Sequence, residues 1–204
     1  MDGNMKGYIT TGLIALCLVL GAVGLFGSSW LTMSEYADAD TGTPAMEGHA
    51  SLSTTYMEID GVECTSEFVE VMGGECDGDA FAMSYSDQCD DTDDEEVCEA
   101  STAGTVGTIG LWIGLILSLV MVLMAVLPMA GVNALNDMMG NLPEMCVTVM
   151  NWAAGGMVLA GALLWLLLLP DTQDADLGMS FYLTIVAGLM GLGATGMNTF
   201  MADE

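Results

Sequence analysis

The stretch Val106–Val132, VGTIGLWIGLILSLVMVLMAVLPMAGV, contains no Asp, Glu, Lys, Arg or His. An α-helix needs about 20 apolar residues to cross a hydrocarbon core about 30 Å thick, so this stretch is long enough to span a membrane. Three further stretches share its length and its lack of charge: Gly7–Trp30, Cys146–Leu169 and Met179–Met201. The sequence therefore predicts a mainly α membrane protein, a four-transmembrane-helix bundle.

Charge is distributed very unevenly along the chain. The formal net charge is −27, from 28 acidic residues against a single basic one, and 20 of the acidic residues lie between Leu31 and Gly104. Contacts to phosphate groups need Lys or Arg, so a nucleic-acid partner is excluded. The acidic segment is predicted to face water, and its excess of carboxylates suggests a halophilic or marine adaptation, where salt screens their repulsion.

The charge at the amino terminus gives an orientation. Lys6 precedes the first apolar stretch, so the positive-inside rule places both termini in the cytoplasm of an integral cell-membrane protein. A cleaved signal peptide is the alternative, although the apolar run exceeds the usual length of about 7–15 residues. The predicted segments are 1–30 (cytoplasmic N-terminus and first span), 31–105 (extracytoplasmic domain), 106–132 (span), 133–145 (cytoplasmic turn), 146–169 (span), 170–178 (short outer loop), 179–201 (span) and 202–204 (cytoplasmic C-terminus).

The extracytoplasmic segment 31–105 carries strand and turn signals. Residues Ser51–Asp60, Glu67–Met72 and Phe81–Tyr85 read as three short strands, because β-branched and aromatic residues are bounded by glycine-containing turns. We expect them to form a small antiparallel sheet. Thr92 and Glu95 fit the start of a helix that leads into the second span.

Four cysteines lie in this segment, namely Cys64, Cys76, Cys89 and Cys98. In a small extracytoplasmic domain they are expected to form two disulfides, for which three connectivities exist. Cys64 with Cys76 is preferred because the two bracket a candidate hairpin, which leaves Cys89 with Cys98. Thiol–disulfide catalysis is disfavoured because the sequence has no C-x-x-C.

The run from Cys89 to Cys98 holds the densest group of carboxylates. A weakly bound Ca²⁺ is one interpretation, although the spacing differs from that of an EF-hand and a solvated acidic surface is the commoner outcome. The candidate ligands are Asp90, Asp91, Asp93, Asp94, Glu95 and Glu96. No other cofactor is expected.

The sequence gives little support for a haem or transition-metal site or for ion-coupled transport. His49 is the single histidine, so no His pair can hold haem or zinc, and the methionines are too scattered to indicate a copper site. The spans contain no ionisable group of the kind that proton- or ion-coupled carriers use. We therefore expect a protein that is not an enzyme and that binds neither haem nor a transition metal.

Glycine is frequent in all four spans. Small residues let membrane helices approach closely, so these positions predict helix packing within the bundle, or lateral assembly with itself or other membrane proteins. The candidate packing positions are Gly110, Gly114, Gly155, Gly188 and Gly191. Aromatic residues near the span ends are expected to anchor in the interface with lipid headgroups; they are Trp30, Trp112, Trp165 and Tyr182.

Trp30 ends the first predicted span, and Gly61-Val62-Glu63-Cys64 is followed by Cys76 in the first extracytoplasmic segment. With these residues and its four-span architecture, the chain resembles the claudin and peripheral myelin protein superfamily of four-span membrane proteins. Claudin-like proteins carry G-L-W-x-x-C at this place, whereas here no tryptophan follows Gly61 and two further cysteines are present. The resemblance implies a left-handed four-helix bundle, an outer sheet whose hairpin is cross-linked by a Cys64–Cys76 disulfide, and a role in cell-surface contact.

The sequence as a whole favours a non-enzymatic tetraspan protein. Its acidic extracytoplasmic domain is expected to mediate assembly, cell-surface contact or accessory-subunit interactions, with membrane lipids and other membrane proteins as partners. An oligomeric channel with an acidic, cation-attracting mouth is the alternative, because such a mouth needs no charge within the spans.

Overall fold

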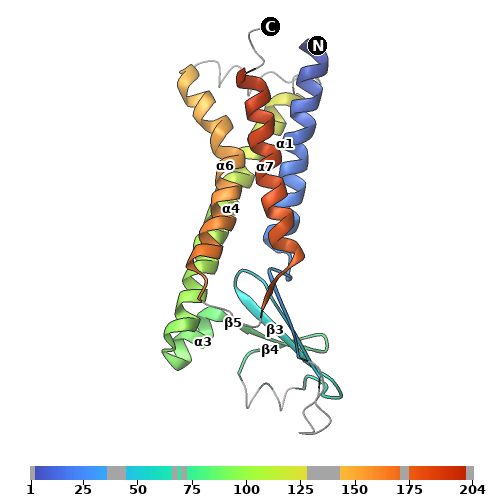
Figure 1. Cartoon of the computed structure of the whole chain (residues 1–204), viewed down its shortest axis with the longest axis vertical. Coiled ribbons are helices and arrows are strands. Elements are labelled where there is room, and N and C mark those ends of the chain that lie inside the picture. The colour runs from blue at the N-terminus through green and yellow to red at the C-terminus, as the bar shows by residue number, and fades with distance from the viewer. Residues whose placement is uncertain are drawn as a thin grey trace. The chain divides into compact units, whose positions relative to one another are not determined.

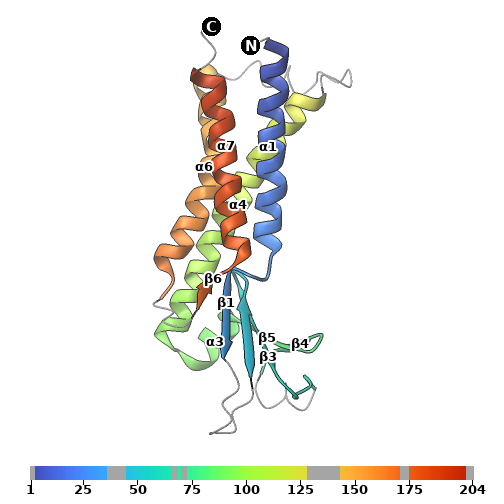
Figure 2. The ribbon, with the colours of Figure 1, turned by 45° about the vertical axis from the view of Figure 1, so that its right-hand side comes forward.

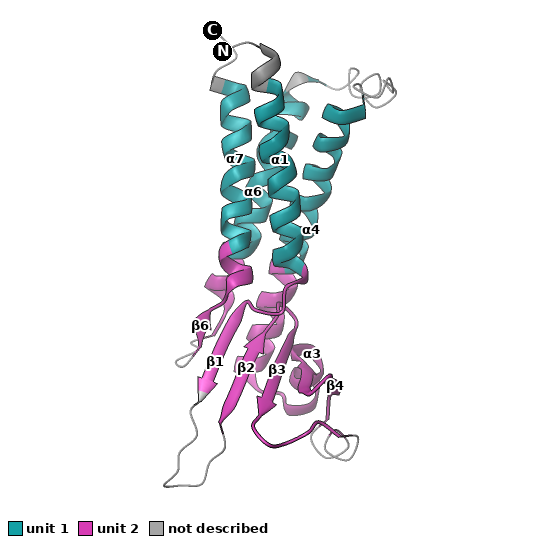
Figure 3. Ribbon diagram, turned by 90° about the vertical axis from the view of Figure 1, so that its right-hand side faces the viewer, with its two compact units in different colours: residues 1–25, 108–163, 183–204 teal, residues 26–107, 164–182 magenta. Residues whose placement is uncertain are grey.

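The structure is a computed structural model that describes residues 3–35, 45–65, 69, 73–127, 143–170 and 175–200. The chain divides into two compact units, shown in Figure 3. Unit 1 comprises residues 1–25, 108–163 and 183–204, and unit 2 comprises residues 26–107 and 164–182. The predicted fold class is confirmed at this level: the structure is mainly helical, with a small antiparallel sheet and two disulfides between the first two long helices.

Four long helices form unit 1 and continue into unit 2 along the chain (Figure 1). They are α1 (Gly3–Phe26), α4 (Glu95–Val126), α6 (Glu144–Leu168) and α7 (Met179–Phe200). Each is long and apolar enough to cross a membrane. The predicted first span extends too far, because α1 ends at Phe26 before Gly27, Ser28 and Ser29, which are poor helix formers. α4 starts at Glu95, ahead of the predicted second span, which confirms the prediction that a helix from the extracytoplasmic segment leads into that span.

Neighbouring helices of unit 1 run antiparallel. Thr10, near the start of α1, donates a hydrogen bond from its Oγ1 to Oδ1 of Asn198, near the end of α7, at 3.3 Å. The other helix pairs meet through Cys17 and Ser118 (α1 with α4), Gly110 and Gly161 (α4 with α6), and Asn151 and Thr195 (α6 with α7). These contacts close a ring in which each helix packs against two neighbours.

The centre of unit 1 is apolar. One buried cluster takes a single residue from each helix, namely Ile14, Met121, Ala154 and Ala194. Large apolar side chains also lie exposed on all four helices, among them Val19, Ile116, Val149 and Leu189. An apolar core together with apolar outward faces is the pattern of helices buried all round by protein and lipid.

Unit 2 is built on a six-stranded antiparallel sheet (Figure 2). The strands are β1 (Leu31–Glu35), β2 (Met46–Ala50), β3 (Thr54–Ile59), β4 (Glu75–Asp77), β5 (Ala80–Ser84) and β6 (Asp176–Leu177). Their order in the sheet is β4-β5-β3-β2-β1-β6. The predicted antiparallel sheet therefore exists, and it takes its last strand from the segment between α6 and α7.

The individual strand predictions need correction. The strand predicted at Ser51–Asp60 is β3, but Ser51 forms a turn in which its Oγ accepts the Thr54 N–H at 2.9 Å. The predicted strand at Glu67–Met72 lies outside the described residues except for Val69. The Val69 N–H bonds to the Thr65 carbonyl and its own carbonyl accepts the Gly73 N–H, so this residue is helical.

The helical part of unit 2 also differs from the prediction. Tyr85 opens a short helix, α3 (Tyr85–Thr92), instead of ending a strand. Its N-cap is Ser84, whose Oγ accepts the Ser86 N–H at 3.2 Å. Thr92, predicted to cap the helix into the second span, ends α3, and Asp94 is the cap because its Oδ1 accepts the Glu96 N–H at 3.0 Å.

An aromatic cluster forms the core of unit 2. The ring centroid of Trp30 lies 4.9 Å from that of Trp165 and 6.0 Å from that of Phe181, both edge to face. Trp30 is 0% exposed and Trp165 is 1% exposed. The prediction that these two tryptophans anchor in the headgroup region is therefore wrong, whereas Trp112 and Tyr182 are half-exposed.

Backbone hydrogen bonds tie the distant segments of unit 2 to this cluster. The Trp30 N–H bonds to the Ala50 carbonyl at 2.7 Å, and the Trp30 carbonyl accepts the Gly178 N–H at 2.8 Å. The Ser29 carbonyl accepts the Ser180 N–H at 3.0 Å. Three stretches far apart in the sequence therefore meet at one tryptophan.

Candidate functional site

The two faces of the sheet in unit 2 differ sharply in chemistry. Side chains alternate along each strand, and residues paired across the ladder share a face. One side, the apolar face, carries Met33, Met46, Met57, Ile59, Phe81 and Met83. The other side, the polar face, carries Thr32, Glu47, His49, Tyr56, Glu58 and Glu75.

The apolar face is buried at one end and open at the other. Leu31 and Ala50, on its buried row, are 6% and 4% exposed. In the same row Thr55 accepts a hydrogen bond on its Oγ1 from Gln88 Nε2 of α3 at 3.4 Å. One row farther along the strands, Met33 is 45% exposed and Met57 is 39% exposed. Water therefore reaches an apolar sheet surface that a folded domain usually covers.

An acidic cleft adjoins the open end of the apolar face. Its volume is about 660 Å³, and its lining includes Ile59 and Val62. Val62 forms a bridge with Ile59 and is 44% exposed. The carboxylates that line the cleft are Glu47, Glu58, Asp60, Glu63 and Asp79. Glu47 and Glu58 belong to the polar face, so the cleft lies at the end of the sheet where the two faces meet. Met57 and Ile59 line, with Val62 and Asp79, a small hollow next to this cleft.

The polar face contains the chain's one histidine. His49 of β2 stacks on Tyr56 of β3, with ring centroids 4.8 Å apart and planes 11° from parallel. The two residues are register partners on neighbouring strands. This aromatic pair packs the sheet surface and needs no metal to explain its position.

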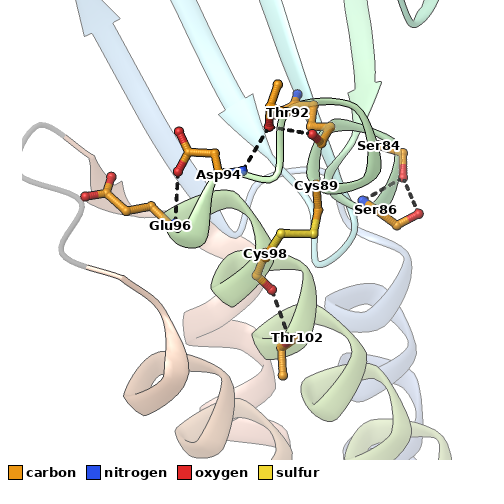
Figure 4. Close-up of a disulfide and its surroundings, with 9 residues drawn as sticks. Ser84, Ser86, Cys89, Thr92, Asp94, Glu96, Cys98 and Thr102 are labelled. Atoms are coloured by element: carbon orange, nitrogen blue, oxygen red, sulfur yellow. Dashed lines mark hydrogen bonds between the residues drawn. A yellow bond between two sulfur atoms is a disulfide. The ribbon is translucent and has the colours of Figure 1, made fainter.

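The six carboxylates predicted as Ca²⁺ ligands lie at and beside the turn from α3 to α4. Figure 4 shows two of them, Asp94 and Glu96. Asp93 is the C-cap of α3 with φ of 51°, and Asp94 caps α4. All six side chains are exposed. Among the residues that the structure describes, which include all six, no three His, Cys, Asp or Glu side chains are grouped to hold a metal ion. The structure thus does not bring these carboxylates together around a common point.

The four cysteines of unit 2 form two disulfides, in the pairing that the spacing favours. Cys64–Cys76, with a Cα–Cα distance of 5.8 Å, ties the segment after β3 to β4. Cys89–Cys98, at 4.8 Å, ties α3 to the start of α4. The remaining cysteines are free: Cys17 is buried in unit 1 and Cys146 is exposed.

The five glycines predicted as packing positions all lie at close contacts between helices. A Cβ built on Gly110 would fall 2.7 Å from Cα of Gly161, and one on Gly114 would fall 2.5 Å from Cγ2 of Val158. Gly155, Gly188 and Gly191 make comparably close contacts between α6 and α7. At these distances any side chain larger than hydrogen forces the helices apart.

Sequence reasoning missed the exposed apolar face. Its signal is nonetheless present in β1 and β2, where L-T-M-S-E and M-E-G-H-A alternate apolar or small residues with polar ones. Alternation of period two is the mark of a strand with one apolar side. A comparison with protein-family models finds no match to this chain, and neither does a comparison with curated proteins.

Proposed function

We propose that this protein is a non-enzymatic tetraspan membrane protein whose unit 2 contacts a partner protein. The observation that carries the proposal is the open end of the apolar face, Met33 and Met57, beside the carboxylate-lined cleft. In this proposal both termini are cytoplasmic and unit 2 faces the outer side, where its disulfides persist. The contact serves assembly, cell-surface contact or an accessory-subunit role.

The chemistry of this surface selects the kind of partner. Methionine side chains are flexible and polarizable, so they adapt to apolar groups of different shapes. The carboxylates of the adjoining cleft, among them Glu47 and Glu58 of the polar face, favour a partner that flanks its apolar group with Lys or Arg. A second copy of the same surface is disfavoured, because the chain carries a net charge of −27 and like charges in contact cost several kcal/mol.

The claudin-like resemblance is part of the proposal. Five of the six strands of the antiparallel sheet lie between α1 and α4, and Cys64–Cys76 joins the edge strand β4 to the segment after β3, which supports it. A cell-surface contact role follows from that resemblance and agrees with the partner chemistry above. The acidic surface also suits a salt-rich exterior, where the Debye length shortens and the carboxylates repel one another less.

The interior of unit 1 favours this reading over a channel. Cys17, Val158 and Ala187 form a second buried cluster, and each is 0% exposed. Glycine contacts also bring the helix backbones of neighbouring pairs together. A water-filled path through one copy would have to displace this packing.

Site-specific photocrosslinking in native membranes tests the proposal. A photoreactive amino acid at Met57, on the apolar face, is expected to capture a discrete membrane or surface protein on irradiation. The matched control places the same group at Thr32, an exposed position on the polar face of β1. Equal capture from both positions, or none from Met57, would contradict a partner site on the apolar face.

Purified components then establish the interaction. The captured protein is expected to bind wild type and to bind the double variant Met33→Ser, Met57→Ser at least tenfold more weakly, because two apolar contacts are lost. Binding should also weaken as salt rises, since exposed charge pairs are screened. Undiminished affinity in the double variant would show that the apolar face is not the contact.

A further inference from the structure

A second surface of unit 2 is a groove between α4 and α6. Its volume is about 510 Å³, and it is lined by Glu95, Cys98, Glu99 and Thr102 of α4, by Leu167 and Leu168 at the end of α6, and by Leu169 directly after α6. The groove is separate from the apolar face and the acidic cleft, with which it shares no residue. Its two walls differ in chemistry.

The α4 wall is polar and negative. Glu95, Glu99 and Thr102 follow one another at helical spacing, so they share one side of the helix. Both carboxylates are exposed. The Thr102 hydroxyl donates to the Cys98 carbonyl at 2.9 Å, as Figure 4 shows, which leaves its oxygen free to accept. The N-terminus of α4 carries a partial positive charge, but the Asp94 carboxylate already caps this end of the helix. The partial charge is also smaller than the two full negative charges of Glu95 and Glu99, so the α4 wall of the groove stays negative.

The α6 wall is apolar and belongs to a candidate membrane span. That span runs from Met145 to Leu168. Leu167 is 78% exposed and Leu168 is 42% exposed. Side chains this apolar at the end of a spanning helix contact lipid chains when the helix lies in a bilayer. The groove therefore joins an acyl-chain surface to a pair of carboxylates.

We propose that this groove binds one phospholipid whose headgroup carries an ammonium group. The acyl chain lies against Leu167 and Leu168, and the ammonium pairs with Glu95 and Glu99. Lipids with a net negative headgroup are rejected, because the one basic side chain of the whole protein is Lys6 on α1 and the groove offers only negative charge to a headgroup. The inference rests on the membrane location in the proposed function and is independent of the partner site on the apolar face.

Native mass spectrometry of the full-length protein tests the site. Delipidated protein is offered equimolar phosphatidylethanolamine and phosphatidylglycerol with identical acyl chains, so only the headgroup differs. We expect retained phosphatidylethanolamine to exceed phosphatidylglycerol by about three- to tenfold, the size expected of two exposed charge pairs. Equal retention, or preferred retention of phosphatidylglycerol, would overturn the proposal.

Two variants locate the preference in the groove. The double variant Glu95→Gln, Glu99→Gln is expected to bring the retention ratio close to one. The control is Glu96→Gln, which removes a carboxylate from the same first turn of α4 but not from the groove lining, and it should keep the wild-type ratio. A preference that survives in the double variant, or that falls equally in the control, would contradict the assignment.

Two further measurements distinguish direct headgroup binding from a cation bridge and from binding at another helix. Phosphatidylglycerol that is retained with Mg²⁺ and lost with EDTA would show a cation bridge to an anionic lipid, which overturns the proposal. A photoactivatable phosphatidylethanolamine should label the peptide that contains Leu167 in wild type. Labelling confined to other helices would place the bound lipid elsewhere and would also overturn it. None of these outcomes depends on a partner protein, so failure here is distinguishable from failure of the partner site.

Discussion

Gly155 of α6 and Gly191 of α7 lie in direct backbone contact. A Cβ on Gly191 would fall 2.7 Å from Cα of Gly155, and a Cβ on Gly155 would fall 2.8 Å from Cα of Gly191. Gly191 also faces α1, because the same Cβ would lie 3.0 Å from Sγ of Cys17. Three of the four helices of unit 1 therefore meet at one glycine.

Replacing this glycine should destabilise unit 1. Gly191→Ala is expected to cost about 1–3 kcal/mol, because the added methyl overpacks a contact that backbone atoms cannot relieve. Thermal unfolding in mild detergent measures the change. The control is Gly193→Ala on the same helix, where a Cβ meets nothing within 4 Å and alanine should be neutral or slightly stabilising. Equal melting temperatures for the two variants would disprove the packing role.

The aromatic core of unit 2 should be equally sensitive. Trp30→Ala removes a fully buried ring that contacts Trp165 and Phe181, so we expect a loss of about 3–5 kcal/mol in the free energy of unfolding. Trp112→Ala is the comparison, because Trp112 is 45% exposed and its loss leaves no buried cavity of that size. Denaturant titration of both variants provides the test, and similar losses would argue against a core role for Trp30.

Thiol labelling should report the disulfide pattern. Alkylation of denatured, non-reduced protein is expected to modify Cys17 and Cys146 only, and alkylation after reduction should modify all six cysteines. Peptide mapping should recover the pairs Cys64–Cys76 and Cys89–Cys98. Labelling of all four unit 2 cysteines without reduction would refute the two disulfides.

Tyr85 makes the stability of unit 2 sensitive to high pH. Burial raises the pKa of its phenol to about 12 from the usual value near 10. The folded state therefore holds this proton more tightly, so stability is unaffected below about pH 10 and falls as the pH rises from about 10 to 12. We expect a loss of roughly 1–2 kcal/mol, reduced from the full linkage value because water still reaches part of the side chain.

Tyr85→Phe separates this effect from other alkaline changes. In the ultraviolet titration, the variant should lack the tyrosinate step near pH 12. Its free energy of unfolding should also fall less than that of wild type above pH 10. A wild-type titration without a tyrosinate step delayed to about pH 12 would contradict the burial of Tyr85.

Several features of the fold could be predicted because they are local. A run of about 20 uncharged apolar residues identifies a candidate span wherever it occurs, so all four long helices were predictable. Cys64 and Cys76 lie 12 residues apart and Cys89 and Cys98 lie 9 apart, so each pair is joined by a short loop. Glycine positions such as Gly110 and Gly191 were predictable because only glycine permits such close approach between helices.

The interpretation of Trp30 and Trp165 shows where local reasoning fails. A tryptophan near the end of an apolar stretch usually anchors at the membrane interface. Whether such a ring meets lipid or protein depends on which other segments reach it, and those segments are remote in sequence. Here Trp30, Trp165 and Phe181 bury one another.

The apolar helices, the two disulfides of the acidic segment and the glycine contacts follow from the sequence alone, because each depends on residues close together in the chain or on the residue type. That β6 completes the sheet follows only from the folded arrangement, since Asp176 and Thr32 are 144 residues apart. A strand of two residues, such as β6, has no recognisable pattern in the sequence, and it forms only where the edge of another strand, here β1, lies beside it. The same holds for the apolar face and the groove between α4 and α6, because solvent exposure follows from which surfaces the rest of the chain leaves uncovered.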